Sequence, residues 1–320
     1  MGDHDPQRSA SDAFLHQSGS EAERILRERG PLTGAELHAA VGGEVFGLWK
    51  TCRNGDAFHL RRIGRRYLRL DRAVEGFARL SPSILREFLT YTVVGLPDQD
   101  AELDQAVRAL ERRTQRISRA KRRTAERFTA EVLSIAGVPS DSEHVCVLIA
   151  GDVVYGMSHD VARRESSTGG QVDGSDLDLV VLAADDAPDE VVEALATAIH
   201  QRKWLYLRNP MLREEVDYIV KRFSRLAEQA SFDTFPHQVA CKVFDEAEFL
   251  AGNPALHEAG RRLLAERGVL DALRAMEERA AERRAWREEF LRGIEGEMLP
   301  PETKQQFYTD DEDAEFEHRH

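Results

Sequence analysis

The sequence predicts an α+β protein. A small helical N-terminal domain is expected to continue through a long connecting helix into a mixed-sheet domain with a C-terminal helical tail. Three observations favour this class. Apolar residues recur at helical spacing over much of 20–136. The pattern then changes to short apolar runs typical of buried strands, at 144–150 and 177–182. The charge also changes along the chain. Residues 21–140 carry 22 basic and 16 acidic side chains, whereas residues 141–320 carry 21 basic and 38 acidic side chains.

The composition limits the classes of protein that fit. The chain has 320 residues, 42% of them hydrophobic and 32% charged, which suits folded domains better than a disordered chain. No apolar run approaches the ~20 residues that cross a bilayer, so we expect no membrane partner. Cys52, Cys146 and Cys241 are too widely spaced to suggest a zinc site or a disulfide framework, and the N-terminus lacks a secretion signal. We therefore expect a cytoplasmic location.

Three short helices are expected in the N-terminal domain, after a polar segment, 1–19, that is predicted to be disordered. The first covers 21–29, the second follows a Thr33 cap, and the third has Val45, Leu48 and Trp49 on one side. A turn then leads to two alternating segments, 58–63 and 66–70, which Gly64 and Arg65 separate. This is the pattern of a β-hairpin.

Three helices followed by a basic hairpin resemble a winged helix-turn-helix domain, here over 20–80. The resemblance implies that the third helix enters a nucleic-acid groove and that the hairpin contacts phosphate. Residues 50–72 carry eight basic and two acidic side chains, which suits RNA, tRNA or DNA as a partner. The alternative is a protein-interaction module whose arginines are only solvated. The candidate nucleic-acid contacts are Lys50, Arg53, Arg61, Arg62, Arg65 and Arg66.

Residues 81–140 are expected to form a helical connector, with one helix over 81–94 and a longer helical pattern over 100–136. Nine basic and two acidic residues lie between Arg108 and Arg127. They are either a nucleic-acid-binding spine or the exposed face of a connecting helix. The break at 137–142 marks the expected domain boundary.

Carboxylates gather on the strands predicted after this boundary. In the second strand Asp176 and Asp178 alternate with apolar residues, and side chains two apart share one face of a strand. A third strand, 214–221, carries Asp217 between apolar neighbours. Crowded carboxylates repel one another, and a divalent cation relieves that repulsion. Oxygen ligands alone favour Mg²⁺ or Mn²⁺ over zinc.

An apolar strand that ends in glycine, then Asp-x-Asp, then a later acidic residue resembles the DNA polymerase beta-like nucleotidyltransferase superfamily. The resemblance covers about 144–222. It implies transfer of a nucleoside monophosphate from an NTP to a hydroxyl group, with pyrophosphate leaving. It also implies that Asp176, Asp178 and Asp217 are the catalytic and metal-binding residues, with Asp217 helping to orient or deprotonate the acceptor hydroxyl.

The resemblance implies a phosphate-binding loop at Gly151, and two departures affect it. Asp152 stands where the family usually has Ser or Gly. Asp176 lies 25 positions after Gly151, and the excess around 159–173 is interpreted as a flexible insertion whose arginines meet triphosphate. Ser158 offers an alternative loop hydroxyl. The candidate nucleotide-binding residues are Gly151, Asp152, Ser158, Ser175, Lys221 and Lys242.

Two functions are therefore expected to compete. The first is a Mg²⁺-dependent nucleotidyltransferase that uses ATP and has RNA or tRNA, a protein or a small molecule as acceptor, in a bacterial stress, toxin–antitoxin or defence system. The second is a regulatory nucleic-acid- or protein-binding module that carries a degenerate transferase domain. The expected catalytic core is 141–236, followed by a helical region, 237–300, and a disordered acidic tail, 301–320.

Overall fold

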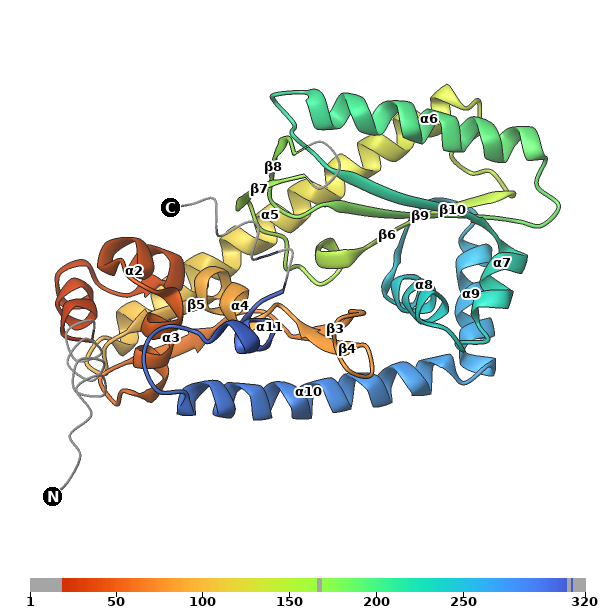
Figure 1. The fold of residues 1–320 in the computed structure, drawn as a ribbon. Helices are drawn as coiled ribbons and strands as arrows, with labels where there is room; N and C mark the ends of the chain where they lie inside the picture. Colours follow the sequence, from red (N-terminus) through yellow and green to blue (C-terminus); the bar gives the residue numbers. More distant parts are fainter. Residues whose placement is uncertain (1–18, 166–168, 310–311, 313–320) are drawn as a thin grey trace, which may run out of the picture. The chain divides into compact units, whose positions relative to one another are not determined.

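The computed structural model describes residues 19–165, 169–309 and 312, which combine helices with small sheets and so confirm the α+β class (Figure 1). Two units are distinguished. The first comprises the described residues up to Leu68, Arg79–Arg113 and those from Arg279 onward; the second comprises Arg69–Ala78 and Thr114–Glu278. The division falls within the long helix and not in the predicted break after it. The predicted disordered segment 1–19 lies, except for residue 19, outside the described residues.

The first unit begins with the expected helices. A helix covers residues 19–29, and the two-residue strand β1, Leu32–Thr33, leads into α2, Gly34–Val41. The Thr33 side chain accepts from the backbone N–H of Glu36, whose carboxylate accepts from the backbone N–H of Thr33 at 2.9 Å. This reciprocal cap satisfies donors at the start of α2. The third helix, α3, covers Val45–Asn54.

The predicted hairpin of 58–63 with 66–70 is wrong. Strand β2, His59–Arg62, pairs with β5, Thr92–Gly95, which also pairs with β1, in the order β1-β5-β2. The segment 66–70 is β3, Tyr67–Leu70, and it pairs with β4, Ala78–Ser81. A central strand needs apolar residues on both faces. Val93 and Val94, both almost completely buried, meet that requirement, whereas 66–70 contains two arginines.

The helix predicted over 81–94 ends at Tyr91, because the residues after it form the central strand β5. Helix α4 covers Ile84–Tyr91, and the β-branched residues that follow continue as β5. Helix α5 then covers Asp100–Ile135, close to the long helical pattern that was predicted. The region 81–140 is therefore not a purely helical connector, because it contributes the central strand of a sheet.

The C-terminal tail is also only partly as predicted. After α10, Val269–Gly293, the chain forms η2, Pro301–Thr303, and α11, Lys304–Phe307. Phe307 is 1% exposed, with its ring centroid 5.4 Å from that of Phe46 and 5.3 Å from that of Trp49. Residues 301–308 therefore belong to the core of the first unit, and most of the acidic tail beyond them lies outside the described residues.

The second unit contains the mixed sheet that was predicted, with strand order β10-β9-β6-β11. Strand β9 is parallel to β10 and antiparallel to β6, which is antiparallel to β11. Alternate residues of β6 and β9 pack with the second half of α5 and with α6 in one apolar core (Figure 1). The bounds are β6 Val145–Ala150, β9 Leu177–Ala183, β10 Val216–Arg222, β11 Glu248–Gly252 and α6 Asp189–Arg208.

Three further helices follow β10 in the second unit: α7, Phe223–Gln229, α8, Phe235–Glu246, and α9, Pro254–Glu266. The insertion predicted to be flexible contains β7, Ala162–Arg164, paired antiparallel with β8, Gln171–Asp173. Residues 166–168 lie outside the described residues. Within the described part of the chain, no helix is long and apolar enough to cross a membrane.

Candidate active site

The three predicted carboxylates meet at one end of two parallel strands. Asp178 of β9 lies directly opposite Asp217 of β10 in the strand register, and Asp176 immediately precedes β9. One carboxylate oxygen from each residue lies within 4.8 Å of the other two. Asp176 and Asp178 are partly buried, and Asp217 is exposed. The sheet therefore gathers side chains that are 41 residues apart in sequence.

This donor set suits a hard divalent cation. Mg²⁺ binds oxygen at ~2.1 Å, so ligands across its coordination sphere lie ~4 Å apart, close to the spacing of these carboxylates. Burial raises the pKa of Asp178 well above its ordinary value, and the nearby Asp176 carboxylate raises it further, whereas Arg69 of the same unit acts against this. Crowded negative charge of this kind is what Mg²⁺ or Mn²⁺ would neutralise.

Gly151 begins the short helix η1, Gly151–Val153, directly after β6, and packs against Asp178. Its φ of +74° favours glycine, and a Cβ at this position would lie 2.1 Å from Oδ2 of Asp178. Its backbone N–H donates to Oε1 of Glu246 at 3.3 Å. The glycine predicted for the phosphate loop thus adjoins the carboxylates, but a protein carboxylate already accepts from its N–H.

Asp152 points toward the carboxylates and not away from them. The Ser175 hydroxyl donates to Oδ2 of Asp152 at 2.9 Å and accepts from the backbone N–H of His159 at 3.2 Å. The Asp152 carboxylate also contributes to the raised pKa of Asp178, after the larger effects of burial and Asp176. Ser175 is therefore committed to positioning Asp152, and Asp152 adds negative charge beside the site.

Lys242 lies on helix α8 near the glycine loop and is 7% exposed. Its ammonium donates to the Tyr155 hydroxyl at 2.9 Å and pairs with Glu246, which also accepts from the Tyr155 hydroxyl at 2.7 Å. Lys242, Tyr155 and Glu246 form a buried polar network next to Gly151. The sequence offered no signal for Glu246, because its place depends on how α8 packs.

Two predicted nucleotide contacts are not brought to the site. Ser158 is fully buried, so its hydroxyl cannot meet a phosphate, and its backbone N–H donates to Ser118. Lys221 lies four residues along β10 from Asp217, ~13 Å at the rise of a strand, and donates to Gln229 at 2.8 Å. Burial lowers the pKa of Lys221 to about 8.

Of the two arginines of the insertion that were expected to meet triphosphate, Arg164 is exposed and Arg163 has structural contacts. Arg163 on β7 pairs with Glu215, Nη1 to Oε2 at 2.6 Å, and its Nε donates to the carbonyl oxygen of Gly174 at 3.0 Å. Gly174 needs to be glycine, since its φ is +80° and a Cβ would lie 1.8 Å from the carbonyl oxygen of His159. Arg163 therefore holds the chain just before β9 and β10.

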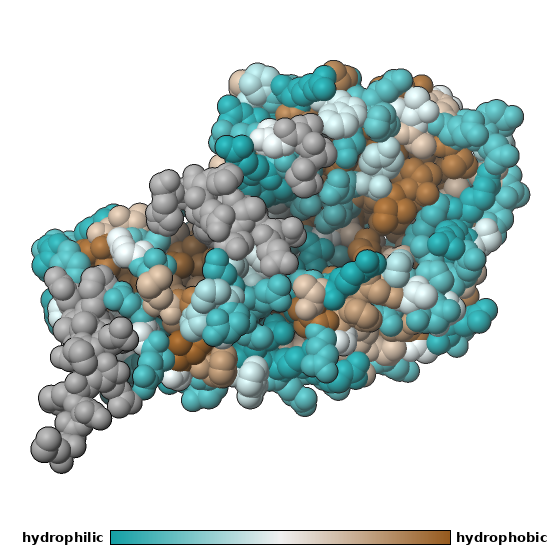
Figure 2. Space-filling view, in the orientation of Figure 1, coloured by the Kyte–Doolittle hydropathy of each residue, from teal (hydrophilic) through white to brown (hydrophobic). Residues whose placement is uncertain are grey.

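Sequence reasoning missed two features beside Asp217. Nζ of Lys203, on α6, lies 3.6 Å from Oδ1 of Asp217. Ile219, two residues further along the same face of β10, is 46% exposed. Figure 2 shows apolar surface between α6 and α7, over the strands labelled β9 and β10 in Figure 1. An apolar surface of this kind suits the ring and sugar of a nucleoside.

Several candidate nucleic-acid contacts in the first unit are engaged within the protein. Lys50 is 8% exposed and donates to the carbonyl oxygens of Ile294 and Gly296, so its ammonium group is held within the first unit. Arg66 makes a two-pronged pair with Glu87, and Arg53 and Arg62 also pair with carboxylates. The exposed candidates are Arg53, Arg61, Arg62 and Arg65, and Arg61 also lies 3.9 Å from a carboxylate oxygen of Asp100.

No protein-family model matches the chain, and no curated protein or solved structure is similar enough to match it. The geometry of the site therefore carries the functional argument.

Proposed function

We propose that this protein is a metal-dependent nucleotidyltransferase that moves a nucleoside monophosphate from an NTP, with ATP as the first choice, to a hydroxyl group. One observation carries the proposal: Asp178 and Asp217 lie in register on parallel strands, and Asp176 completes an oxygen cluster sized for a divalent cation. The glycine at the end of the neighbouring strand, packed on Asp178, fits the same type of site.

Each carboxylate has its own part in this proposal. Asp176 and Asp178 share one face at the start of β9 and hold the cation, which when bound neutralises triphosphate charge. Asp217 is exposed on β10, where an acceptor hydroxyl can reach it, and orients that hydroxyl. Lys203 offsets its charge from the side of α6.

For the first unit we propose a winged helix-turn-helix-like role in acceptor selection. Three helices accompanied by the antiparallel β1-β5-β2 sheet support it, although the wing is built from β2 and β5. Exposed Arg61 and Arg65 remain candidates for phosphate contact, which favours RNA or tRNA among the acceptors, with a protein or small molecule as the others. A bacterial stress or defence system is the setting we propose.

The test is label transfer from each α-³²P-labelled NTP in Mg²⁺ or Mn²⁺, with total RNA, a cell lysate and a panel of small hydroxyl compounds as acceptors. Asp178→Asn should lower the rate by at least 100-fold, because it removes a metal ligand. Asp186→Asn is the matched control, since this aspartate is 84% exposed beyond the far end of β9. Equal label from both variants would exclude the assigned site.

A second candidate has one specific observation in its favour. Asp152 and Glu246 place two extra carboxylates around Gly151, where a triphosphate would need donors. A degenerate transferase domain that serves regulatory binding of nucleic acid or protein would tolerate this arrangement. Absence of label with every acceptor, together with wild-type binding of RNA or protein by Asp178→Asn, would favour this function.

A further inference from the structure

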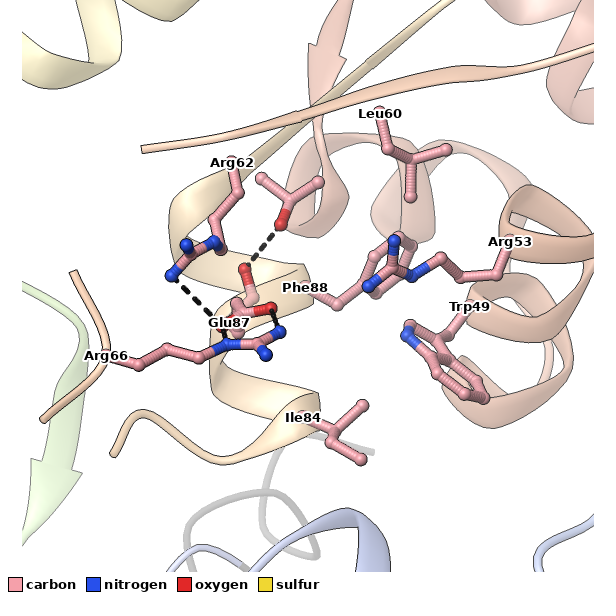
Figure 3. A pocket seen from close by; sticks show the side chains of 9 residues that line it. Trp49, Arg53, Leu60, Arg62, Arg66, Ile84, Glu87 and Phe88 are labelled. Atoms are coloured by element: carbon pink, nitrogen blue, oxygen red, sulfur yellow. Dashed lines mark hydrogen bonds and ion pairs between the residues drawn. The ribbon is translucent and has the colours of Figure 1, made fainter. Parts of the chain in front are cut away.

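A separate cavity lies within the first unit and has no part in the proposed transfer. It has a volume of about 90 Å³. In Figure 3, Arg62 and Arg66 extend toward Glu87, while Arg53 and Trp49 reach in from α3. The space exceeds the ~10–15 Å³ that one water needs and is smaller than the ~300 Å³ of a typical pocket for an organic ligand.

The polar lining of this cavity is rich in donors and poor in acceptors. Both oxygens of Glu87 already accept from Arg66, each at 2.7 Å, and Oε2 lies 3.7 Å from Arg62. The Thr92 hydroxyl donates to the backbone oxygen of Glu87. The indole nitrogen of Trp49 lies on the side of the ring that faces the cavity, and within the described residues its N–H has no acceptor (Figure 3).

The charges around the cavity are also unbalanced. Among the described residues, the four guanidinium groups of Arg53, Arg62, Arg66 and Arg284 make ion pairs with two carboxylates, those of Glu87 and Glu288. Arg284 is 5% exposed, and its Nη2 is buried without a hydrogen bond to any described residue. Surplus positive charge in a partly buried place is costly unless an anion accompanies it.

We propose that this cavity binds one phosphate-sized oxyanion, either inorganic phosphate or the phosphate group of a mononucleotide. Arg53 and Arg62 are its primary contacts, because their side chains are 36% and 39% exposed and each makes one longer ion pair. A guanidinium presents two parallel donors to such an oxyanion. The Trp49 N–H supplies a further donor, and Arg66 and Arg284 pair with the Glu87 carboxylate, which also lines the cavity.

The test is calorimetric titration of the full chain without divalent metal, using inorganic phosphate, AMP and chloride at one ionic strength. Constant ionic strength removes general screening effects. We expect saturable phosphate binding in the wild type that is at least 10-fold weaker in Arg53→Gln and Arg62→Gln. Arg29→Gln, which changes an exposed arginine of the first helix outside the cavity lining, should bind like the wild type. Tighter binding of AMP than of phosphate, lost in the same variants, would identify a nucleotide as the source.

A further variant keeps the test decisive if an arginine variant fails to fold. Trp49→Phe keeps an aromatic ring in the core and removes the N–H donor together with part of the indole ring, so we expect binding weakened about threefold with unchanged circular dichroism. Two results would overturn the proposal. One is phosphate binding of equal strength in the wild type, Arg62→Gln and Trp49→Phe. The other is heat from phosphate no greater than heat from chloride.

Discussion

Gly151 and Asp178 are in direct contact at the end of β6. The glycine has two constraints there, a φ of +74° and the Asp178 carboxylate where a Cβ would be. Gly156, five residues later, has a similar φ of +66°, but no described atom lies within 4 Å of the place that its Cβ would take. An alanine at Gly156 therefore introduces backbone strain alone, whereas an alanine at Gly151 also displaces the Asp178 carboxylate.

The first prediction uses this pair. Gly151→Ala should lower the free energy of unfolding by about 2 kcal/mol or more, because strain and steric overlap add. It should also lower the rate of label transfer at least 10-fold by displacing Asp178. Gly156→Ala should cost about 1 kcal/mol and keep the transfer rate. Urea denaturation and the labelling assay measure both effects; equal transfer rates would contradict the assigned contact.

Lys221 gives a prediction about pH. Its buried ammonium has its pKa lowered to about 8, so its charged form destabilises the folded state at neutral pH. Lys221→Met should raise the free energy of unfolding by about 1 kcal/mol at pH 7, after the lost hydrogen bond to Gln229 is subtracted. Above pH 8 the folded lysine releases its proton while the unfolded one keeps it to about pH 10.4. Wild-type stability therefore rises through that window, and the advantage of the variant shrinks.

Denaturation at pH 7 and pH 10 checks this sign. The contrary result is a stability difference between Lys221→Met and the wild type that is the same at both pH values. That result would mean that the charged form of Lys221 does not destabilise the folded state.

At the scale of elements, α4 and the part of α10 in the first unit are joined by buried charges. Glu87 of α4 is 5% exposed and faces Arg66, Arg284 and Arg62. Removing the charge of one member of such a cluster leaves the others unpaired, which costs more than the pair itself contributes. The cluster therefore stabilises the packing of α4 more than a surface ion pair would.

Glu87→Gln should lower the free energy of unfolding by about 3 kcal/mol, because three guanidiniums each lose an ion pair and, among the described residues, Glu288 alone remains to pair with Arg66 and Arg284. Glu289→Gln is the matched control on α10: this glutamate is 77% exposed and pairs with Arg292, three residues along the helix, so its loss should cost less than about 0.5 kcal/mol. Chemical denaturation compares the two. An equal loss of unfolding free energy in the two variants would show that the buried cluster stabilises the protein no more than a surface ion pair does.

Local sequence pattern was enough to predict the strands of the candidate site. The apolar run at 144–150 is β6, and the Asp-x-Asp strand and the Asp217 strand are β9 and β10. Pairing was harder, because it depends on residues far apart in sequence. Thr92-Val93-Val94 extends an apolar helical pattern, and only its place between β1 and β2 identifies it as a strand.

The errors in the predicted contacts of the site's lysines also arise because those contacts join residues far apart in sequence. Lys221 and Lys242 lie in the expected elements or regions, but their contacts with Gln229 and Glu246 depend on how α7 and α8 pack. Lys203 reaches Asp217 from α6, and nothing in its local sequence sets it apart from other helical lysines. Side-chain contacts between elements are decided by packing, which a single sequence does not display.

At the scale of the whole molecule, the described residues form two apolar cores, one in each unit. The net charge of −13 disfavours general binding to nucleic acid. Part of the basic stretch of α5 is also used internally, since Lys121 pairs with Glu214 at 2.7 Å and Arg122 pairs with Glu248. We therefore expect specific phosphate contact to depend on a few exposed arginines and not on the overall charge.

The central claim is that Asp176, Asp178 and Asp217 together bind a divalent cation. The most direct measurement is electron paramagnetic resonance of Mn²⁺, which distinguishes free from bound ions, on the full chain with and without ATP. We predict stoichiometric Mn²⁺ binding by the wild type and by Asp186→Asn in the presence of ATP, and at least 10-fold weaker binding by Asp178→Asn. Mn²⁺ binding of the same affinity in all three proteins would contradict the account.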